Sequence, residues 1–548
     1  MSWVPGVVGQ AVPQYAGDEP TVELGDNNNV ATLIQPQDPI ILNFNKPLDI
    51  HSVSEDSLKI WRDSQPEEFT WYQDGTALVI KPKQPLQYGS SYRLDLSSQI
   101  TDLSGNAVAE QTLAFTMPTY ESSNAIPTVI LSAYPGFPCA TKNATFGQDN
   151  GRCLGGKEGD DLLPIPSMPA NRMINLIFSQ PVNAETAVLG TTFEVEQCES
   201  TTNCASPVPV TGELKVRGSS LTFIPTQPWQ DAALYRYRIK TASADSDAAC
   251  QAKTALCALS AGESRPVVTA FLQPNAITNN PELEVYFTGA KATESVQQIL
   301  RNLPSTDIDA NFKIEASEAG LLTGKNTVQL EAHTPEKLIE FVKVGCDEQD
   351  HCPDDQIIHV TGALGADILG YDSTQKAVKV AVYPTQIFTS SATLYIRYEY
   401  DEDYSSPPEA RTDTIETNAQ LMRIRYAKDA EGKRTQPAIG WIKEKDGKAF
   451  MEVTLELYLD APQLQLELLG ASQSHDLHSR ALELTLSGPV EFLADGRLQI
   501  QQQSTDKISI KVITTQTNGT TTATAAKMTL DIPEGGINMN YVTEPVKQ

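Results

Sequence analysis

Hydrophobic and polar residues alternate in short runs along most of the chain, and turn-forming residues separate the runs. In residues 92–96, for example, Tyr92, Leu94 and Leu96 fall on one side of an extended backbone while polar residues fall on the other. Runs of this kind recur about every ten residues, with Gly, Pro, Asn and Asp between them. Short strands at this spacing predict an all-β protein built from antiparallel sandwiches.

Part of this first region is repeated later in the chain. Residues 174–182 repeat residues 40–48, with Phe178 in the place of Phe44 and Pro181 in the place of Pro47. Two copies of one domain are therefore predicted. The further matches are 221–229 with 78–86, 235–239 with 92–96, and 271–274 with 115–118.

A fixed order of short motifs marks the first copy. It runs Phe-x-x-Pro-Leu from Phe44, Leu-x-Ile-x-Pro-x-x-Pro-Leu-x-x-Gly-x-x-Tyr from Leu78, Asp-x-x-Gly-Asn from Asp102, and a closing Phe115-Thr116. This series resembles the bacterial Ig-like domain found in surface-layer proteins and other bacterial surface proteins. The resemblance implies tandem Ig-like sandwiches within residues 20–275. It is looser in the second copy, where the turn lacks its glycine and asparagine.

Changes of pattern divide the chain further. The segment 293–303 has apolar residues at helical spacing and is predicted to be a helix. The chain as a whole is predicted to be elongated and multi-domain, with further β-rich domains after the two sandwiches. The predicted divisions are an N-terminal segment 1–19, sandwich 20–120, sandwich 121–276 with disulfide-bearing insertions, a divergent β-rich domain 277–400, a linker 401–411, and a β-rich C-terminal domain 412–548. A third Ig-like sandwich is one interpretation of residues 277–400.

Long alternations distinguish the last of these regions. Val453, Leu455 and Leu457 line one face of a predicted strand, and similar series follow around Leu484 and Ile510. Strands with one apolar face must bury that face against another layer. The pattern predicts the core of a sandwich or closed sheet. A sheet that holds lipid, or a docking surface, is the alternative interpretation.

The eight cysteines fall into four pairs that are close in sequence. The even count, with no cysteine left over, predicts four local disulfide loops and an oxidising compartment. Zinc sites usually have gaps of two to four residues within a pair, and the gaps here are wider. The pairs are Cys139 with Cys153, Cys198 with Cys204, Cys250 with Cys257, and Cys346 with Cys352.

Charge narrows the range of partners. The chain has 41 Lys and Arg against 69 Asp and Glu, a formal net charge of -28. A surface of this sign repels phosphate backbones, so nucleic acid is not an expected partner. No run approaches the roughly 20 apolar residues that a membrane-spanning helix requires.

Candidate chemistry is sparse. The chain has no Gly-x-Ser-x-Gly motif, and every cysteine has an apparent partner, so the sequence predicts a protein that is not an enzyme and has no cofactor. Two weak metal candidates remain: His475 with His478, and the acidic loop with Asp347, Asp350 and Asp354, whose oxygens would suit calcium. Solvated loops are the alternative for both.

Three aromatic residues of the first copy, Trp61, Trp71 and Tyr72, are close in sequence. Exposed aromatic rings could form a platform for sugars, whereas rings on strands usually pack in a core or between strands. Packing is the predicted role.

Together these features predict an exported bacterial protein located outside the cell or at its surface, with the periplasm or outer-membrane anchoring as alternatives. The expected role is structural, adhesive or binding, with other surface proteins or glycans as partners. The alternatives are the non-catalytic part of an envelope or polysaccharide-active enzyme, and lipid binding by the C-terminal domain. The start of the sequence has no export signal, so we expect a removed signal, or a lipid anchor, upstream of Met1.

Overall fold

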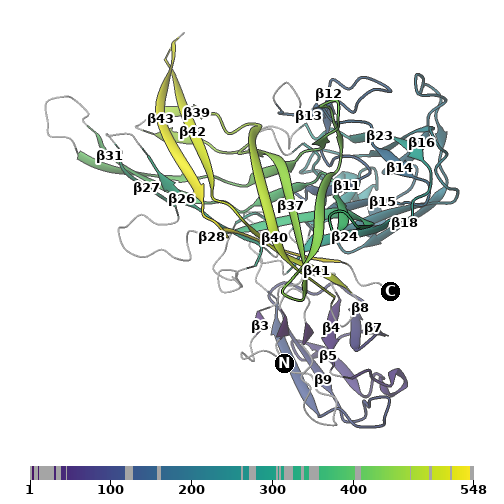
Figure 1. Ribbon diagram of the computed structural model, residues 1–548. Helices are drawn as coiled ribbons and strands as arrows, with labels where there is room; N and C mark the ends of the chain where they lie inside the picture. The colour runs from purple at the N-terminus through teal and green to yellow at the C-terminus, as the bar shows by residue number, and fades with distance from the viewer. Residues whose placement is uncertain are drawn as a thin grey trace.

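The structure is a computed structural model, and its described residues are almost entirely β (Figure 1). Within them, the only α-helix is α1 (Asp247–Gln251). Four short pairs of strands lie outside the large sheets: β1 (Trp3–Val4) with β2 (Gln10–Ala11), β12 (Thr141–Lys142) with β13 (Arg152–Cys153), β21 (Cys257–Ser260) with β22 (Glu263–Pro266), and β34 (Ala427–Lys428) with β35 (Arg434–Gln436). The described residues are 3–4, 10–11, 30–31, 39–44, 46–117, 127–156, 162–260, 263–270, 279–303, 307, 310–313, 325–334, 339–344, 357–400, 409–468, 471–492, 497–518 and 521–543.

The first sandwich packs a five-stranded sheet on a three-stranded sheet. Tyr92, Leu94 and Leu96 are buried between the sheets while Arg93 is exposed, as the alternation predicts. One sheet has the order β3 (Val30–Ala31), β10 (Gln111–Thr116), β9 (Ser91–Leu96), β5 (Leu58–Arg62), β6 (Gln65–Pro66), and the other has the order β4 (Ile40–Asn43), β8 (Ala77–Pro82), β7 (Phe69–Asp74).

The second sandwich repeats this plan with four and five strands. Its first sheet has the order β11 (Ile130–Tyr134), β15 (Ile174–Phe178), β19 (Ser220–Pro225), β18 (Gly212–Arg217). Its second sheet has the order β14 (Ser167–Pro169), β23 (Leu283–Ala290), β20 (Leu234–Ile239), β16 (Phe193–Gln197), β17 (Val208–Pro209).

A shared tyrosine corner supports the duplication. In the first copy the Tyr92 hydroxyl accepts the backbone N–H of Gln87 at 2.8 Å, and its ring stacks on Phe115. In the second copy the Tyr235 hydroxyl accepts the N–H of Gln230 at 3.0 Å, and its ring stacks on Phe287. The counterpart of Phe115 is thus Phe287 on β23. The predicted closing segment 271–274 lies outside the described residues, and the second sandwich extends beyond the predicted boundary at 276 to Ala290.

The helix predicted at 293–303 is wrong. Residues Val296–Asn302 form strand β24, which pairs with β28 (Ile357–Asp372) and β44 (Ile537–Thr543). Leu300 faces the core, and Val296 is exposed at the start of the strand. Tertiary pairing on both sides of β24 outweighs the local helical spacing.

The regions on both sides of 401–411 form one closed sheet. Following the hydrogen-bonded pairs, β24 joins β44, β41 (Leu498–Ser504), β40 (Arg480–Phe492), β37 (Lys448–Asp460), β33 (Gln420–Ile424), β30 (Gln386–Thr389) and β28, and β28 returns to β24. Three more strands extend it: β25 (Thr327–Gln329), β29 (Ala377–Val382) and β36 (Ala438–Lys445). The predicted linker therefore does not separate two domains.

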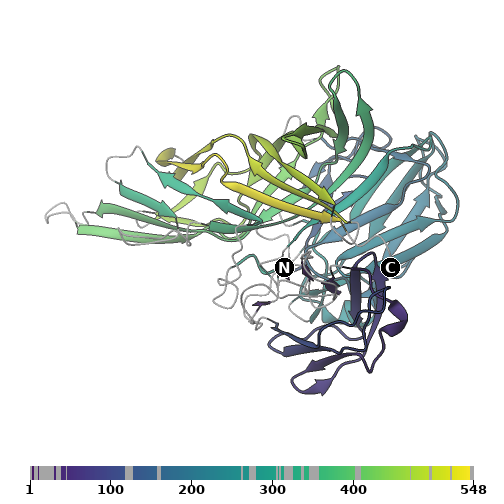
Figure 2. The ribbon, with the colours of Figure 1, turned by 60° about the horizontal axis from the view of Figure 1, so that its bottom comes forward.

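Two further sheets form an arm that extends from this closed sheet away from the sandwiches (Figure 2). The five-stranded sheet of the arm has the order β26 (Glu331–His333), β43 (Thr521–Ile532), β42 (Ile508–Asn518), β39 (Ala471–His475), β38 (Leu466–Leu468). The three-stranded sheet has the order β27 (Ile339–Val344), β31 (Thr393–Tyr400), β32 (Glu409–Glu416). One apolar core runs through the closed sheet and the arm.

A buried ion pair joins the second sandwich to the closed sheet. The guanidinium of Arg172 donates to Asp367 Oδ1 at 2.9 Å, and the hydroxyl of Tyr383 donates to Asp367 Oδ2 at 2.8 Å. Both charged side chains are at most one-tenth exposed. The first sandwich has a smaller contact, in which Ile41 and Val79 pack against Val542.

The turn at Asp102 forms as its motif predicts. Its carboxylate accepts the N–H groups of Ser104 and Asn106 at 2.8 and 2.9 Å, and Gly105 has a φ of +84°. The side-chain amide of Asn106 also donates to this carboxylate and lowers the pKa of Asp102 below its ordinary value.

We expect this turn to loosen in acid. A lowered pKa in the folded state means that the carboxylate stabilises the turn above the ordinary Asp pKa, and that this stabilisation is lost as the pH falls through the lowered pKa. Hydrogen exchange should show the protection factors of the Ser104 and Asn106 amides falling between pH 7 and pH 3. In Asp102→Ala they should be low at both values. Equal protection of these amides in the unaltered protein at the two pH values would contradict this account.

Candidate functional site

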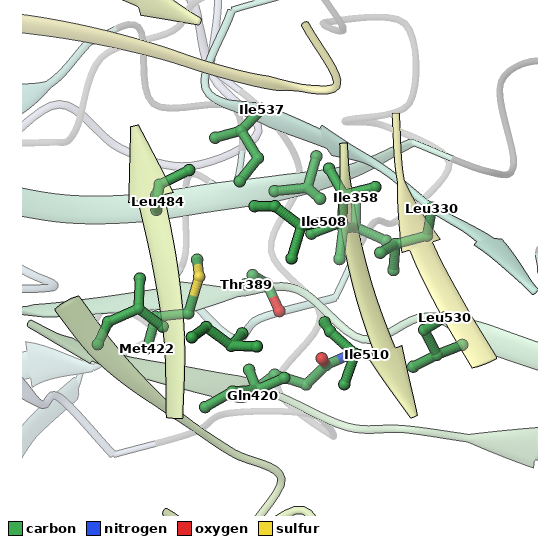
Figure 3. Close-up of a pocket in the computed structure, with 15 residues that line it drawn as sticks. Leu330, Ile358, Thr389, Gln420, Met422, Leu484, Ile508, Ile510, Leu530 and Ile537 are labelled. Carbon is green, nitrogen blue, oxygen red and sulfur yellow. The ribbon is translucent and has the colours of Figure 1, made fainter. Parts of the chain in front are cut away.

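An apolar cavity lies where the closed sheet meets the five-stranded sheet of the arm (Figure 3). In the figure Leu484 and Met422 lie on one side of the cavity, Leu330 and Leu530 lie on the other, and Ile508 and Ile510 lie between them. The cavity volume is about 30 Å³. That is roughly the share of one water molecule in the liquid, so a larger ligand must part the walls to enter.

Strand pairing places aliphatic side chains around the cavity. On the arm, Ile508 pairs with Ile532 and Ile510 pairs with Leu530, so one face of this sheet is aliphatic where it covers the cavity. On the closed sheet, Leu457 pairs with Leu482 and Leu455 pairs with Leu484. The alternation read from the sequence therefore supplies both walls.

Side-chain packing holds the two walls together. Among the described residues, no ladder of backbone hydrogen bonds joins the closed sheet to the five-stranded sheet. The chain connects them at 330, 461–465, 476–479, 505–507 and 533–536. The walls can therefore separate at this seam without breaking a strand ladder.

Two neutral polar residues interrupt the apolar lining. Thr389 on β30 and Gln420 on β33 stand directly opposite each other in the strand pairing, and both face the cavity. Every other described lining residue is aliphatic or methionine, and none carries a charge. The sequence analysis missed both residues, because a Thr or Gln within a short strand gives no periodic signal.

A larger polar hollow lies on the second sandwich, with a volume of about 450 Å³. Its charged groups pair with each other or with neighbours: Lys253 with Glu185 at 3.2 Å, and Arg265 with Glu263 at 2.6 Å. These pairs are largely exposed, so they are weak and do not converge on a ligand. The apolar cavity is the stronger candidate site.

Of the predicted metal ligands, the structure brings His475 and His478 together, and it places no third ligand with them among its described residues. Asp347, Asp350 and Asp354 lie outside the described residues, and no group of three or more His, Cys, Asp or Glu side chains suited to a metal occurs within them. The rings of His475 and His478 stack with their centroids 4.7 Å apart, and Nδ1 of His475 accepts the N–H of Leu477. Asp476 instead accepts the N–H of Ile513 and pairs with Arg480.

The three candidate aromatic residues do not form a platform. Trp61 lies on β5 and donates to Asp95 at 2.8 Å, whereas Trp71 lies on β7 in the other sheet and packs beside Phe69. Tyr72 packs at the contact between the first sandwich and the closed sheet.

Three of the four predicted disulfides are present. Cys139 bonds Cys153, Cys198 bonds Cys204, and Cys250 bonds Cys257. The pair Cys346 and Cys352 lies outside the described residues. Within the described residues, no helix is both long and apolar enough to cross a membrane.

Comparison with known families identifies the first sandwich. The family model described as "Bacterial Ig-like domain" matches residues 17–117. Residues 17–117 are a bacterial Ig-like domain. Together with the disulfides, this domain places the chain outside the cell or at the cell surface, as predicted.

A curated relative covers the whole chain. It is alkane uptake protein B of Marinobacter nauticus, which is 29% identical over 607 aligned positions. The alignment covers 100% of this chain and 53% of that protein, so the chain spans about half the length of the relative.

Solved structures overlap only weakly. The N-terminal part of the bacterial S-layer protein SbsC has a TM-score of 0.19 at 14% identity, covering 40% of this chain and 41% of that one. Domains 1–6 of the same surface-layer protein have a TM-score of 0.18 at 10% identity, covering 93% and 66%. Neither overlap is close enough to bear on fold or function.

The closed sheet and the arm share one apolar core and together form the C-terminal unit. We expect the residues that line the cavity to be essential to the stability of this unit. Leu484 is 2% exposed, so Leu484→Ala should lower the free energy of unfolding by about 2–5 kcal/mol, through lost burial and a larger cavity. Phe492, on the same strand but 79% exposed, serves as the control. Its change to Ala should shift the value by less than about 0.5 kcal/mol. Urea unfolding measures both, and similar losses in the two variants would contradict this assignment of the core.

Proposed function

We propose that this chain is a non-catalytic bacterial surface protein whose C-terminal unit binds an aliphatic chain, such as a long-chain alkane. The observation that carries the proposal is the cavity between the closed sheet and the arm, whose lining is aliphatic except for two neutral side chains. A ligand without charge or polar groups needs only such a surface, because transfer from water supplies the binding free energy.

The magnitude of that transfer free energy favours the proposal. Burying a methylene group contributes roughly 0.8 kcal/mol, so ten methylenes would contribute about 8 kcal/mol. Opening the seam separates apolar side chains, and the ligand then covers the surfaces that it separates. Because no described strand ladder crosses the seam, opening costs no set of backbone hydrogen bonds there.

The curated relative supports the same function independently. Its name, alkane uptake protein B, assigns that protein to alkane uptake. We extend this role to the present chain as one step, the holding of an alkane at the surface. The two sandwiches then serve as a support: the buried pair of Arg172 with Asp367 fixes the second sandwich to the closed sheet and so orients the arm.

Filling the cavity should prevent binding. Ile510 is 3% exposed and lines the cavity, so the larger side chain of Ile510→Trp should occupy the space that a ligand needs. We expect the affinity for the apolar fluorophore N-phenyl-1-naphthylamine, and for n-dodecane as its competitor, to fall at least tenfold. Fluorescence titration of the full chain measures both.

Ile513→Trp is the matched control, because Ile513 lies on the same strand, is 37% exposed and does not line the cavity. Its affinity should equal that of the unaltered protein. Circular dichroism and thermal unfolding check that both variants fold. Unchanged competition by dodecane in a folded Ile510→Trp variant, or no binding by the unaltered protein, would overturn the proposal.

A further inference from the structure

We infer that the preferred ligand is a long aliphatic chain with a single neutral oxygen function, such as a primary alcohol, and that Thr389 binds the oxygen. This inference rests on the proposed function and adds the chemical class of the ligand. It starts from the only hydroxyl group among the described residues that line the cavity.

The Thr389 hydroxyl is buried without a partner. The residue is 4% exposed and lies on β30, and within the described residues its Oγ1 has no hydrogen-bond partner. A buried hydroxyl without a partner costs roughly 1–3 kcal/mol, which is why such groups are rare in folded proteins. Figure 3 shows Thr389 beside the aliphatic side chains of the cavity rather than turned away from them.

Gln420 supplies the second half of the site. It stands opposite Thr389 on the neighbouring strand β33, and its Nε2 donates to Thr417 Oγ1 at 3.2 Å. This bond holds the amide in place and leaves its carbonyl oxygen as an acceptor. A ligand hydroxyl placed between the two strands can accept from Thr389 and donate to Gln420.

The lining also discriminates by charge. None of its described residues is a cation, so the carboxylate of a fatty acid would lose its water without gaining an ionic partner. Burial of an unpaired charge is far more costly than burial of a hydroxyl that makes its hydrogen bonds. The site therefore favours an alcohol over both the bare alkane and the ionised acid of equal length.

Competition among three twelve-carbon ligands tests the inference. In this test, N-phenyl-1-naphthylamine is first bound to the full chain. Its displacement by n-dodecane, by 1-dodecanol and by dodecanoate is then measured at pH 8. We expect dodecanol to compete about 3–10-fold better than dodecane, the value of one hydrogen bond, and dodecanoate to compete worse than dodecanol. In Thr389→Val, which keeps the shape but removes the hydroxyl, the preference for dodecanol over dodecane should disappear while dodecane still binds.

Thr454→Val is the matched control, because Thr454 is exposed on β37 and makes its hydrogen bond to Thr485 on the outer surface. It should keep the preference for the alcohol. The thermal midpoint of Thr389→Val should equal or exceed that of the unaltered protein, since the change removes a hydroxyl that lacks a partner. A lower midpoint would show that the hydroxyl is satisfied within the protein, and would overturn the inference.

The outcomes separate the two proposals. If neither dodecane nor dodecanol displaces the fluorophore, the proposed function fails and this inference fails with it. If dodecane competes but dodecanol is no better, or if the preference survives in Thr389→Val, aliphatic binding stands and the assignment of Thr389 is overturned. If Thr389 binds a water molecule and not the oxygen of the ligand, dodecane will compete but dodecanol will compete no better.

Discussion

Most of strand β28, from residue 358 to residue 367, is buried on both faces, and the arrangement of the second sandwich, the closed sheet and the arm depends on this constraint. Ile358 and Val360 face the interior of the closed sheet, whereas Asp367 on the opposite face binds Arg172 beside the second sandwich. Gly362 permits this packing, because a Cβ at this position would lie 2.9 Å from Oδ1 of Asn302. One face of β28 thus helps to form the cavity, and the other face holds the closed sheet against the second sandwich.

This arrangement has a mechanical consequence for the proposed site. One wall of the cavity belongs to the closed sheet, whose strands are bonded in a ring and packed on the second sandwich. The other wall belongs to the arm, which meets the first by side-chain packing and short connections. Parting of the walls to admit a ligand would therefore move the arm and leave the supported wall in place.

Local patterns predicted local structure well. The motifs around Phe44, Tyr92 and Asp102 predicted the first sandwich, and alternation around Leu455 predicted strands with one apolar face. Long-range pairing was not predictable, because β24 and β44 meet across about 240 residues and no local pattern records that contact. Burial on both faces also removes alternation, so β28 was not recognised. Thr389 could not be recognised as a candidate ligand-binding residue from the sequence, because only the folded structure shows that its hydroxyl is buried in an apolar lining without a partner.

The central claim is that an aliphatic chain occupies the cavity between the closed sheet and the arm. Crystals of the full chain grown with 1-bromododecane test it most directly, because anomalous scattering locates the bromine without reference to the rest of the map. The account predicts an anomalous peak among the cavity residues. It also predicts that the walls move apart, so that the cavity is larger than its present volume of about 30 Å³. Bromine found only on outer surfaces, beside a cavity of unchanged volume, would contradict it.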